Sequence, residues 1–341
     1  MKTSAMCALL AALAFGLLPG NRDEAAAPDK GLVLLVETQQ DAQAPQKASS
    51  ARQNQSEKAA VQTAPDAQTV RLLDGGAVTA LSMEDYLTGV LLSEMPADFE
   101  PEARKAQAVA ARTFTCRKLL QPKHENADVC AEASCCQAWT SQERLRQKYG
   151  ASFDALWSAA REAVRQTAGQ VLTYDGQLID AVYFSCSGGA TEAAVAVWGT
   201  DVPYLQAVES PGEEAAPRFS SRAVFSPEEF SQRLMQENPD VQLSGSPDAW
   251  LGETTRSAGG GAATCSIGGV SFSGTQLRRM FGLNSTRLTL SYQDGDFVFD
   301  VTGFGHRVGM SQYGAQTMAQ LGFSYRTILQ YYYQGAEVER Q

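Results

Sequence analysis

The stretch MEDYLTGVLLSEMPADFEPEARKAQAVAARTFTCRKLL, residues 83–120, predicts two helices joined by a turn that contains proline. Its first half spaces apolar residues as one face of a helix requires, and Pro96 ends that helix just after Glu94. Ser82 precedes the first helix and can cap it. Pro101 begins the second helix, whose buried stripe is mostly alanine and therefore lets another backbone approach closely.

The segments around this pair alternate irregularly between strand and helix patterns. VRLLDGGAVTAL precedes it as a strand with a glycine turn, and SFDALWSAAREAVRQTAGQVLTY follows it as a helix that leads into a strand. Further strands are expected in LIDAVYFSC, TCSIGGV, TRLTLSY and DFVFDVTG, and further helices around SPEEFSQRLMQ and SYRTILQYYY. Because no regular βαβ rhythm appears, the sequence favours an α+β fold over a doubly wound sheet.

The N-terminal part differs in composition from the rest. An apolar stretch, 5–18, suits the core of a signal peptide and is short for a bilayer span. A second apolar patch leaves open whether this segment is cleaved or retained as an anchor, and a buried helix of a cytosolic protein is the alternative. Residues 37–69 contain eight glutamines and no aromatic residue, which predicts a disordered linker. We therefore expect an exported chain with a signal peptide or membrane anchor at 1–36, the linker, and one folded domain at 70–341.

The charge of the chain excludes one class of partner. The formal net charge is −10 and the isoelectric point is near 4.9. Proteins that bind nucleic acid need a basic face, so no nucleic acid partner is expected.

Glu94 is a candidate for acid catalysis. Apolar neighbours and the negative end of its helix both disfavour the carboxylate and so raise its pKa. A carboxyl that stays protonated near neutral pH is what a general acid requires. The alternative, from these residues alone, is a glutamate at a helix end that pairs with an arginine such as Arg112.

Three cysteines cluster near one of the two histidines. His124, Cys130 and Cys136 are evenly spaced as H-x5-C-x5-C, and Cys135 adjoins the last. Thiolate and imidazole are the ligands that zinc prefers. An exported protein can instead oxidise the six cysteines that follow the signal in pairs, so the residues alone leave zinc and disulfides equally supported.

Two glycine-rich stretches are candidates for a binding surface. YFSCSGGATE, residues 183–192, combines a strand end, two glycines and several polar side chains. GFGHRVGMSQYGA, residues 303–315, sets His306 among four glycines with serine, glutamine and tyrosine. Amides, hydroxyls and an aromatic ring beside glycine backbone suit a sugar chain. For His306 itself, a histidine bonded inside a glycine-rich turn is the alternative.

Taken together, these motifs resemble the stage II sporulation protein D family of lytic transglycosylases. The likeness runs from about residue 70 to 338 and rests on MEDYLTGVLLSEMP, ARKAQAVAARTF, YFSCSGGATE with VWGTDVPYLQAV, SGTQLRRMFGLNST and GFGHRVGMSQYGAQTMAQLGFSYRTILQYYYQGAEV. It implies an α+β fold in which helices and short strands form a two-lobed unit around a glycan-binding groove.

The resemblance also implies an activity. The family cleaves the bond between N-acetylmuramic acid and N-acetylglucosamine in peptidoglycan strands freed of stem peptides, leaving 1,6-anhydro-N-acetylmuramic acid ends. Glu94 stands at the position of the family's catalytic glutamate, and would act as acid and then as base. One carboxylate is sufficient because the sugar's own hydroxymethyl group can attack, whereas hydrolytic glycosidases usually need two.

Further site residues follow from the resemblance. The groove and its substrate contacts are expected to include Arg112, Ser185, Gly188, Thr191, Glu192, His306, Ser311, Gln312 and Tyr313. Some family members hold zinc near the active site at the H-x5-C-x5-C spacing, which favours His124, Cys130 and Cys136 as ligands of a structural zinc ion over a disulfide. The other cysteines are left as free or paired thiols.

One position departs from the family pattern. The family usually has GHGVGMSQ in the C-terminal motif, and Arg307 stands here in place of the central glycine. Arginine adds a positive charge and disfavours a backbone with positive φ. Either the loop tolerates it or the binding wall is altered.

The resemblance implies partners and a location. Expected partners are peptidoglycan glycan strands, the sporulation amidase of the same stage (protein P) and the membrane scaffold (protein M). The chain is expected to be exported, tethered by its N-terminal segment and facing the cell wall during engulfment. The alternative is an amidase enhancer, which binds the wall and stimulates a separate hydrolase; a purely structural wall-binding module is a third hypothesis.

Overall fold

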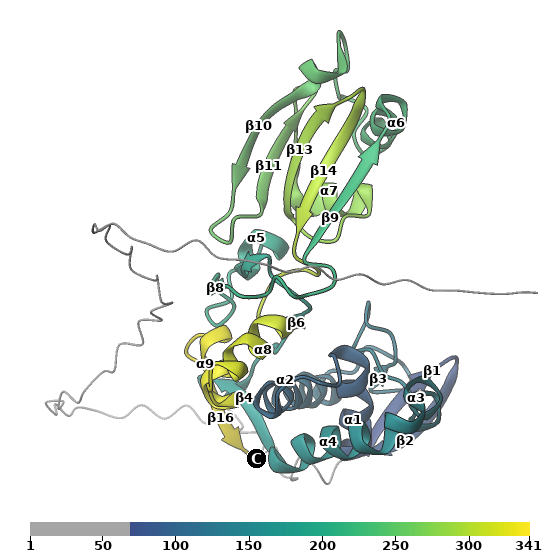
Figure 1. The fold of residues 1–341 in the computed structure, drawn as a ribbon, viewed down its shortest axis with the longest axis vertical. Helices are drawn as coiled ribbons and strands as arrows, with labels where there is room; N and C mark the ends of the chain where they lie inside the picture. Colours follow the sequence, from purple (N-terminus) through teal and green to yellow (C-terminus); the bar gives the residue numbers. More distant parts are fainter. Residues whose placement is uncertain (1–68) are drawn as a thin grey trace, which may run out of the picture. The chain divides into compact units, whose positions relative to one another are not determined.

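The computed structural model describes residues 69–341, and it contains the helical pair that the sequence predicts (Figure 1). Helix α1 spans Met83–Glu94, and the Ser82 hydroxyl accepts the N–H of Asp85 at 3.1 Å, as a cap should. Helix α2 spans Pro101–Leu120 and begins at the proline. The first helix therefore ends on the residue that the sequence singles out as a candidate acid.

A first core forms where α1 packs on a small sheet and two later helices. Strands β1 (Thr69–Asp74) and β2 (Ala77–Ser82) form a hairpin, and β3 (Val129–Cys130) pairs with β1 in parallel. Helices α3 (Gln142–Tyr149) and α4 (Phe153–Gln166) follow, separated by the 3-10 turn η2 (Gly150–Ser152). Leu72, Leu87, Phe153 and Val164 lie in this core.

Helix α2 separates this core from a second one, and its alanines make that possible. Ala106 and Ala110 face the second core while Ala108 and Ala111 face the first, all fully buried. Helices α8 (Gln312–Gln320) and α9 (Tyr325–Tyr332) and the sheet β16 (Glu337–Arg340), β4 (Gln170–Tyr174) and β5 (Gln177–Leu178) complete the second core. Small side chains on α2 let these layers approach its backbone.

The strand predicted over LIDAVYFSC is wrong in length. Leu178 ends β5, and β6 (Tyr183–Phe184) pairs in parallel with β15 (Met310–Ser311), so no strand covers residues 179–182. The backbone upstream turns instead, because the Val182 N–H bonds the Asp180 carbonyl and the Asp180 N–H bonds the Tyr204 hydroxyl. The following segment holds strands β7 (Gly189–Ala190) and β8 (Glu209–Ser210), which pair, and helix α5 (Ala194–Trp198).

Residues 220–302 form an inserted unit with a core of its own. One sheet joins β13 (Arg287–Gln293), β14 (Asp296–Thr302) and β9 (Ser220–Phe225), and another joins β10 (Leu251–Arg256), β11 (Ala262–Ile267) and β12 (Val270–Ser273) (Figure 1). Helices α6 (Pro227–Glu237) and α7 (Gly274–Phe281) and the 3-10 turn η3 (Pro247–Trp250) complete it. Its core is rich in phenylalanine, with Phe230 stacked on Phe297.

The architecture confirms the α+β class expected from the sequence. Helices α3, α5, α7 and α8 were not predicted, and TCSIGGV forms a hairpin of β11 and β12 rather than one strand. Within residues 69–341 no helix has the length and apolar character needed to cross a bilayer. The expected signal or anchor at 1–36 and, except for Thr69, the linker at 37–69 lie outside the described residues.

Candidate active site

A pocket of about 560 Å³ lies at the C-terminal end of α1. Its lining comes from that helix end, α2, the loop after β3, the end of α3, strand β6 with its flanking residues, residues 217–218 and 304–306, and the first residues of α8. Six of the predicted site residues are in this lining: Glu94, Cys136, Ser185, His306, Gln312 and Tyr313. Residues more than 200 positions apart in the sequence thus share one cavity.

Glu94 has the chemistry of an acid in this pocket. The carboxyl is the last group of α1 and accepts the backbone N–H of Ala138 at 2.5 Å. Burial raises its pKa from 4.5 to about 7, even though that hydrogen bond opposes the shift. Among the described residues that line the pocket, Glu94 is the one carboxylic acid. The cavity therefore offers one proton donor and no second carboxylate.

A buried amide holds the loop opposite Glu94. Gln137 donates to the hydroxyls of Tyr86 at 3.2 Å and Thr115 at 3.0 Å, and its carbonyl accepts from Tyr183 at 2.8 Å. All three partners lie on other elements, so Gln137 fixes the loop against α1, α2 and β6. Sequence reasoning missed both Gln137 and Ala138, because neither residue type signals such a role on its own.

The loop that carries Ala138 also carries the predicted metal ligands. His124, Cys130 and Cys136 come together as expected, and Cys135 joins them, with all four ligand atoms within 4.8 Å of one another. His124 Nε2 lies 3.6 Å from the Cys136 sulfur and 3.8 Å from the Cys135 sulfur. The structure thus supplies a candidate for the fourth ligand, which the spacing did not reveal.

The donor set fits a tetrahedral metal ion. Zinc bound at 2.3 Å by thiolates holds neighbouring ligand atoms about 3.8 Å apart, close to the distances between the sulfurs and the imidazole here. Among the described residues, Cys130, Cys135 and Cys136 take part in no disulfide. Burial raises the pKa of the Cys136 thiol to about 12 and so favours its protonated form. A bound cation would instead favour the thiolate.

His306 forms part of the pocket wall as a neutral ring. Its Nδ1 accepts the Val308 N–H at 3.1 Å, so the proton of the neutral ring is on Nε2. Burial, and secondarily the charge of Arg278, lower its pKa to about 4. The ring contacts Phe184 and Trp198, with centroids 5.6 and 5.5 Å away. Trp198 is 48% exposed beside it, a candidate for sugar stacking that sequence reasoning did not identify as a site residue.

Pairing of β6 with β15 brings the serine and tyrosine of the two glycine-rich stretches together. The Tyr313 N–H donates to the Ser185 carbonyl at 3.0 Å, and the Tyr313 ring meets Phe99 edge-on. Ser311 is fully buried, where its hydroxyl accepts the N–H of Gly314 and caps α8. Ser311 therefore supports the pocket from beneath rather than lining it.

Four other predicted site residues lie away from the pocket lining. Arg112 is fully buried and donates to the Val164 carbonyl at 3.0 Å. Gly188, with φ of 76°, packs against the backbone of Thr302, where a Cβ would be 2.9 Å away. Thr191 is buried and accepts the N–H of Val208 at 2.9 Å. The fourth, Glu192, is buried against Arg307.

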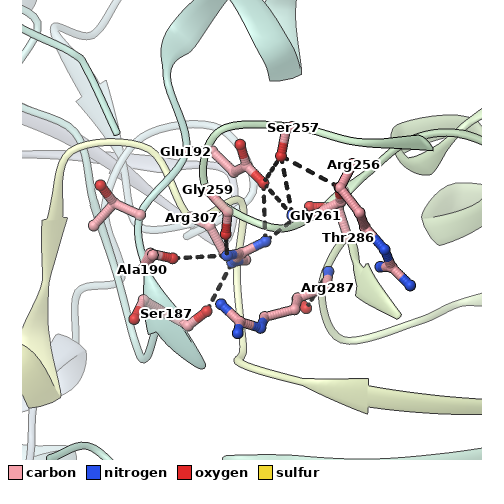
Figure 2. Close-up of polar contacts among 12 residues, drawn as sticks. Ser187, Ala190, Glu192, Arg256, Ser257, Gly259, Gly261, Thr286, Arg287 and Arg307 are labelled. Atoms are coloured by element: carbon pink, nitrogen blue, oxygen red, sulfur yellow. Dashed lines mark hydrogen bonds and ion pairs between the residues drawn. The ribbon is translucent and has the colours of Figure 1, made fainter. Parts of the chain in front are cut away.

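Arg307 occupies a left-handed backbone position and makes up for it with buried hydrogen bonds (Figure 2). Its φ is 67°, and its side chain is completely buried. The guanidinium donates to the carbonyls of Ser187, Ala190 and Gly259, each at 2.7 Å, and to the Glu192 carboxylate at 3.1 Å. Burial lowers its pKa to about 10, so it remains charged at neutral pH. The loop tolerates this arginine.

Glu192 extends the same network into the inserted unit (Figure 2). Its Oε1 accepts the Ser257 hydroxyl at 2.6 Å and the Gly261 N–H at 2.9 Å, while its Oε2 is buried with no hydrogen-bond partner among the described residues. The buried ion pair therefore ties the segment after β6 to the turn between β10 and β11.

Comparison with known proteins gives consistent results. A family model described as stage II sporulation protein matches residues 74–174. The chain is 36% identical over 303 residues to stage II sporulation protein D of Bacillus subtilis, covering 83% of this chain and 85% of that protein. It is 37% identical over 265 residues to the protein of the same name from Bacillus amyloliquefaciens, covering 76% and 75%. An amidase enhancer of Bacillus subtilis is 30% identical over 301 residues, which is 73% of this chain but 39% of that protein.

Proposed function

The chain belongs to the stage II sporulation protein D family, and from that premise we propose that it is a peptidoglycan lytic transglycosylase acting in sporulation. The proposed substrate is a glycan strand already freed of stem peptides. The products would be a shortened strand and an end of 1,6-anhydro-N-acetylmuramic acid.

The observation that carries this proposal is the solitary carboxyl of Glu94. With a pKa of about 7, a large share of Glu94, about half at pH 7, carries the proton that a general acid must give. A hydrolase needs a second carboxylate within about 10 Å to activate water or attack the sugar, and the described pocket lining supplies none. An intramolecular nucleophile removes that need.

The proposed reaction balances without water. Glu94 gives its proton to the glycosidic oxygen, and the bond between that oxygen and C1 of N-acetylmuramic acid breaks. The 6-hydroxyl of the same sugar bonds to C1 and releases its proton to the Glu94 carboxylate. The acid is restored at the end, and one carboxyl performs both proton transfers.

The other lining residues would bind the sugars. Aromatic rings from Tyr149, Tyr183, Phe304 and Tyr313 offer apolar faces, and the amide of Gln312 offers hydrogen bonds. His306 would act here as a neutral group, since its pKa of about 4 keeps it from serving as an acid.

We propose that His124, Cys130, Cys135 and Cys136 bind one zinc ion that orders this wall. When bound, zinc would supply a fixed positive charge and hold the four ligands in a tetrahedron. The ligands themselves, through the loop that continues into Gln137 and Ala138, would set the position of the donor to Glu94. Because the four ligands fill a tetrahedral shell, this is a structural site rather than one that activates water.

A cleavage assay tests the proposal directly. Full-length protein and its Glu94→Gln variant are incubated with glycan strands that carry or lack stem peptides, and mass spectrometry identifies the fragments. Anhydro-ended sugars are expected from the unaltered protein and not from the Glu94→Gln variant. Glu214→Gln, an exposed glutamate, is the matched control. Reducing ends would indicate a hydrolase and overturn the proposed reaction.

The amidase enhancer is the second candidate function, favoured by the similarity to the enhancer of Bacillus subtilis. This function predicts that neither the unaltered protein nor Glu94→Gln cleaves glycan, and that both stimulate a separate amidase equally. We propose the stripping amidase (protein P) and the membrane scaffold (protein M) of the same sporulation stage as partners, and an exported, tethered location facing the wall. A loss of amidase stimulation in Glu94→Gln would count against a purely enhancing role.

A further inference from the structure

The inserted unit has one open, polar sheet face. Arg287 on β13 pairs with Thr302 on β14, which pairs with Ser220 on β9. Two residues further along the strands, Thr289, Asp300 and Arg222 are paired in the same order. Side chains opposite one another share a face, so all six residues point the same way. The other face bears Leu288 and Val301 and packs on the phenylalanine core.

A cavity of about 690 Å³ lies on this open face and gathers three arginines. We call it the arginine pocket; its charged lining is Arg222, Arg256, Arg287 and Asp300. Three positive groups against one carboxylate leave a surplus of positive charge in a chain whose formal net charge is −10. Such a concentration in an acidic protein favours an anionic ligand.

The arginines of this pocket are poorly neutralised. The guanidinium of Arg287 has no hydrogen bond or ion pair to any described residue, and that of Arg256 has one bond, to the Leu288 carbonyl. Arg222 reaches the Asp300 carboxylate only at 3.7 Å and bonds the amide of Gln293. Their donors therefore remain available for a ligand with oxygen acceptors.

Arg287 is held at its place by its neighbours. An added Cβ at Gly260 would be 3.3 Å, and one at Gly189 3.5 Å, from its guanidinium, so both glycine backbones closely approach it. Gly189 and Gly260 adjoin Ala190 and Gly259, whose carbonyls the buried Arg307 fixes (Figure 2). The two arginines repel each other, which helps to lower the pKa of Arg307. An anion beside Arg287 would relieve that repulsion.

The arginine pocket adjoins the pocket of Glu94 along two chain segments. On one segment, Arg218 lines the Glu94 pocket and Ser220 lines the arginine pocket. On the other, Phe304 lines the Glu94 pocket and Thr302 lines the arginine pocket. The Arg218 guanidinium also stacks on the Phe304 ring, 4.7 Å from its centroid. Residues two positions apart lie at most about 7 Å from each other, a separation that a glycan strand of a few sugars can span.

We propose that the arginine pocket binds the lactyl carboxylate of a peptide-free N-acetylmuramic acid next to the cleavage site. This inference rests on the proposed function and names its substrate determinant. Removing a stem peptide by amide hydrolysis converts a neutral amide at the lactyl group into a carboxylate. Arg287, with Arg222 and Arg256 beside it, would thereby distinguish stripped strands from peptide-bearing ones.

Binding of modified strands tests this proposal. Full-length protein with Glu94→Gln, which leaves the strands intact, is titrated with peptide-free strands and with the same strands after their carboxylates are converted to primary amides. We expect the amidated strands to bind about tenfold more weakly, the loss for one charge-assisted hydrogen-bonded pair. Adding Arg287→Gln should remove this difference, as should Arg222→Gln, which guards against a folding defect in the first variant. Arg165→Gln, an exposed arginine on α4, should leave it unchanged.

Each outcome bears on the proposal. Equal binding of both strands by the protein with all its arginines, or an undiminished preference in both arginine variants, overturns it. Stronger competition by a phosphate polymer such as teichoic acid than by free peptide-free strands also overturns the glycan assignment, because phosphate shares the same chemistry. Cleavage is measured separately with Glu94 intact. If the protein discriminates between the strands but does not cleave them, the proposed reaction is wrong and the role of the arginine pocket is supported. If it cleaves them without discriminating, only the role of the arginine pocket is wrong.

Discussion

The carboxyl of Glu94 and the backbone N–H of Ala138 are joined by a 2.5 Å hydrogen bond. Ala138 lies two residues after Cys136, so the candidate acid and the candidate metal cluster share one short loop. Whatever orders that loop also sets the hydrogen bond that partly offsets the effect of burial on the acid. The cluster can therefore influence the chemistry without touching a substrate.

The first prediction is a pH dependence of cleavage. Because the reactive form of Glu94 is protonated and its pKa is about 7, the rate should be level below pH 7 and fall about tenfold for each unit above it. Initial rates of release of anhydro-ended fragments from pH 5 to 9 test this. His306→Gln should keep the same midpoint, since that histidine titrates near pH 4. A midpoint near 4.5 would contradict the assignment.

The second prediction concerns stability. The folded protein holds the Glu94 proton more tightly than the unfolded chain, so stability from this group is present below pH 4.5 and is lost as the pH rises to about 7. At 1.36 kcal/mol per pKa unit the loss approaches about 3 kcal/mol. Glu94→Gln keeps an acceptor for the Ala138 N–H and avoids this loss. Urea unfolding at pH 5 and pH 8 should show the variant gaining relative stability at pH 8, whereas Glu214→Gln should show no such gain.

The third prediction concerns the metal. Purified protein should contain about one zinc ion per chain, and Cys136→Ser should lose it together with stability. An ion present at a thousand times its dissociation constant stabilises a fold by about 4 kcal/mol, so chelation should lower the melting temperature of the unaltered protein markedly. Cys265→Ser, in the core of the inserted unit, is the control and should retain the ion. Full metal content in Cys136→Ser would disprove the ligand assignment.

The fourth prediction concerns the buried pair of Arg307 and Glu192. Arg307→Met leaves a buried carboxylate unpaired and three carbonyls without donors, so it should reduce the unfolding free energy by about 3–5 kcal/mol. Arg307→Met combined with Glu192→Gln should recover part of that loss. Arg279→Gln removes an exposed ion pair with Glu237 and should cost about 1 kcal/mol or less. Chemical denaturation measures all three.

Local features of the fold could be predicted from the sequence. Ser82, Pro96 and Pro101 act within a few residues of themselves, so the limits of α1 and α2 were evident. The alanines of α2 are likewise a local sequence feature, and they predicted that other elements pack closely against this helix. Glu94 stood out because its helix end and apolar neighbours are sequence features, although its partner Ala138 is 44 positions away.

Long-range relationships could not be predicted. Arg307 was identifiable as a charge at a glycine position, but the carbonyls that satisfy it come from residues 187, 190 and 259. The spacing that identified His124, Cys130 and Cys136 gave no reason to include Cys135. Its sulfur joins them because the chain turns there, with the N–H groups of Cys135 and Cys136 both donating to the Glu132 carbonyl. Arg112 was predicted as a site residue, but it is buried and donates to a carbonyl of α4. The sequence could not show this, because only the folded chain reveals which face of α2 meets that helix.

The two residues that flank the inserted unit are hydrogen-bonded to each other: the Gly303 N–H donates to the Phe219 carbonyl at 2.7 Å. Residues 220–302 therefore behave as a cassette whose two ends are already adjacent. Its removal would leave the pairing of β6 with β15 connected, but it would take the Ser257, Gly259 and Gly261 partners away from Glu192 and Arg307. A short glycine bridge from 219 to 303 would therefore test in the laboratory whether the Glu94 pocket folds without the inserted unit.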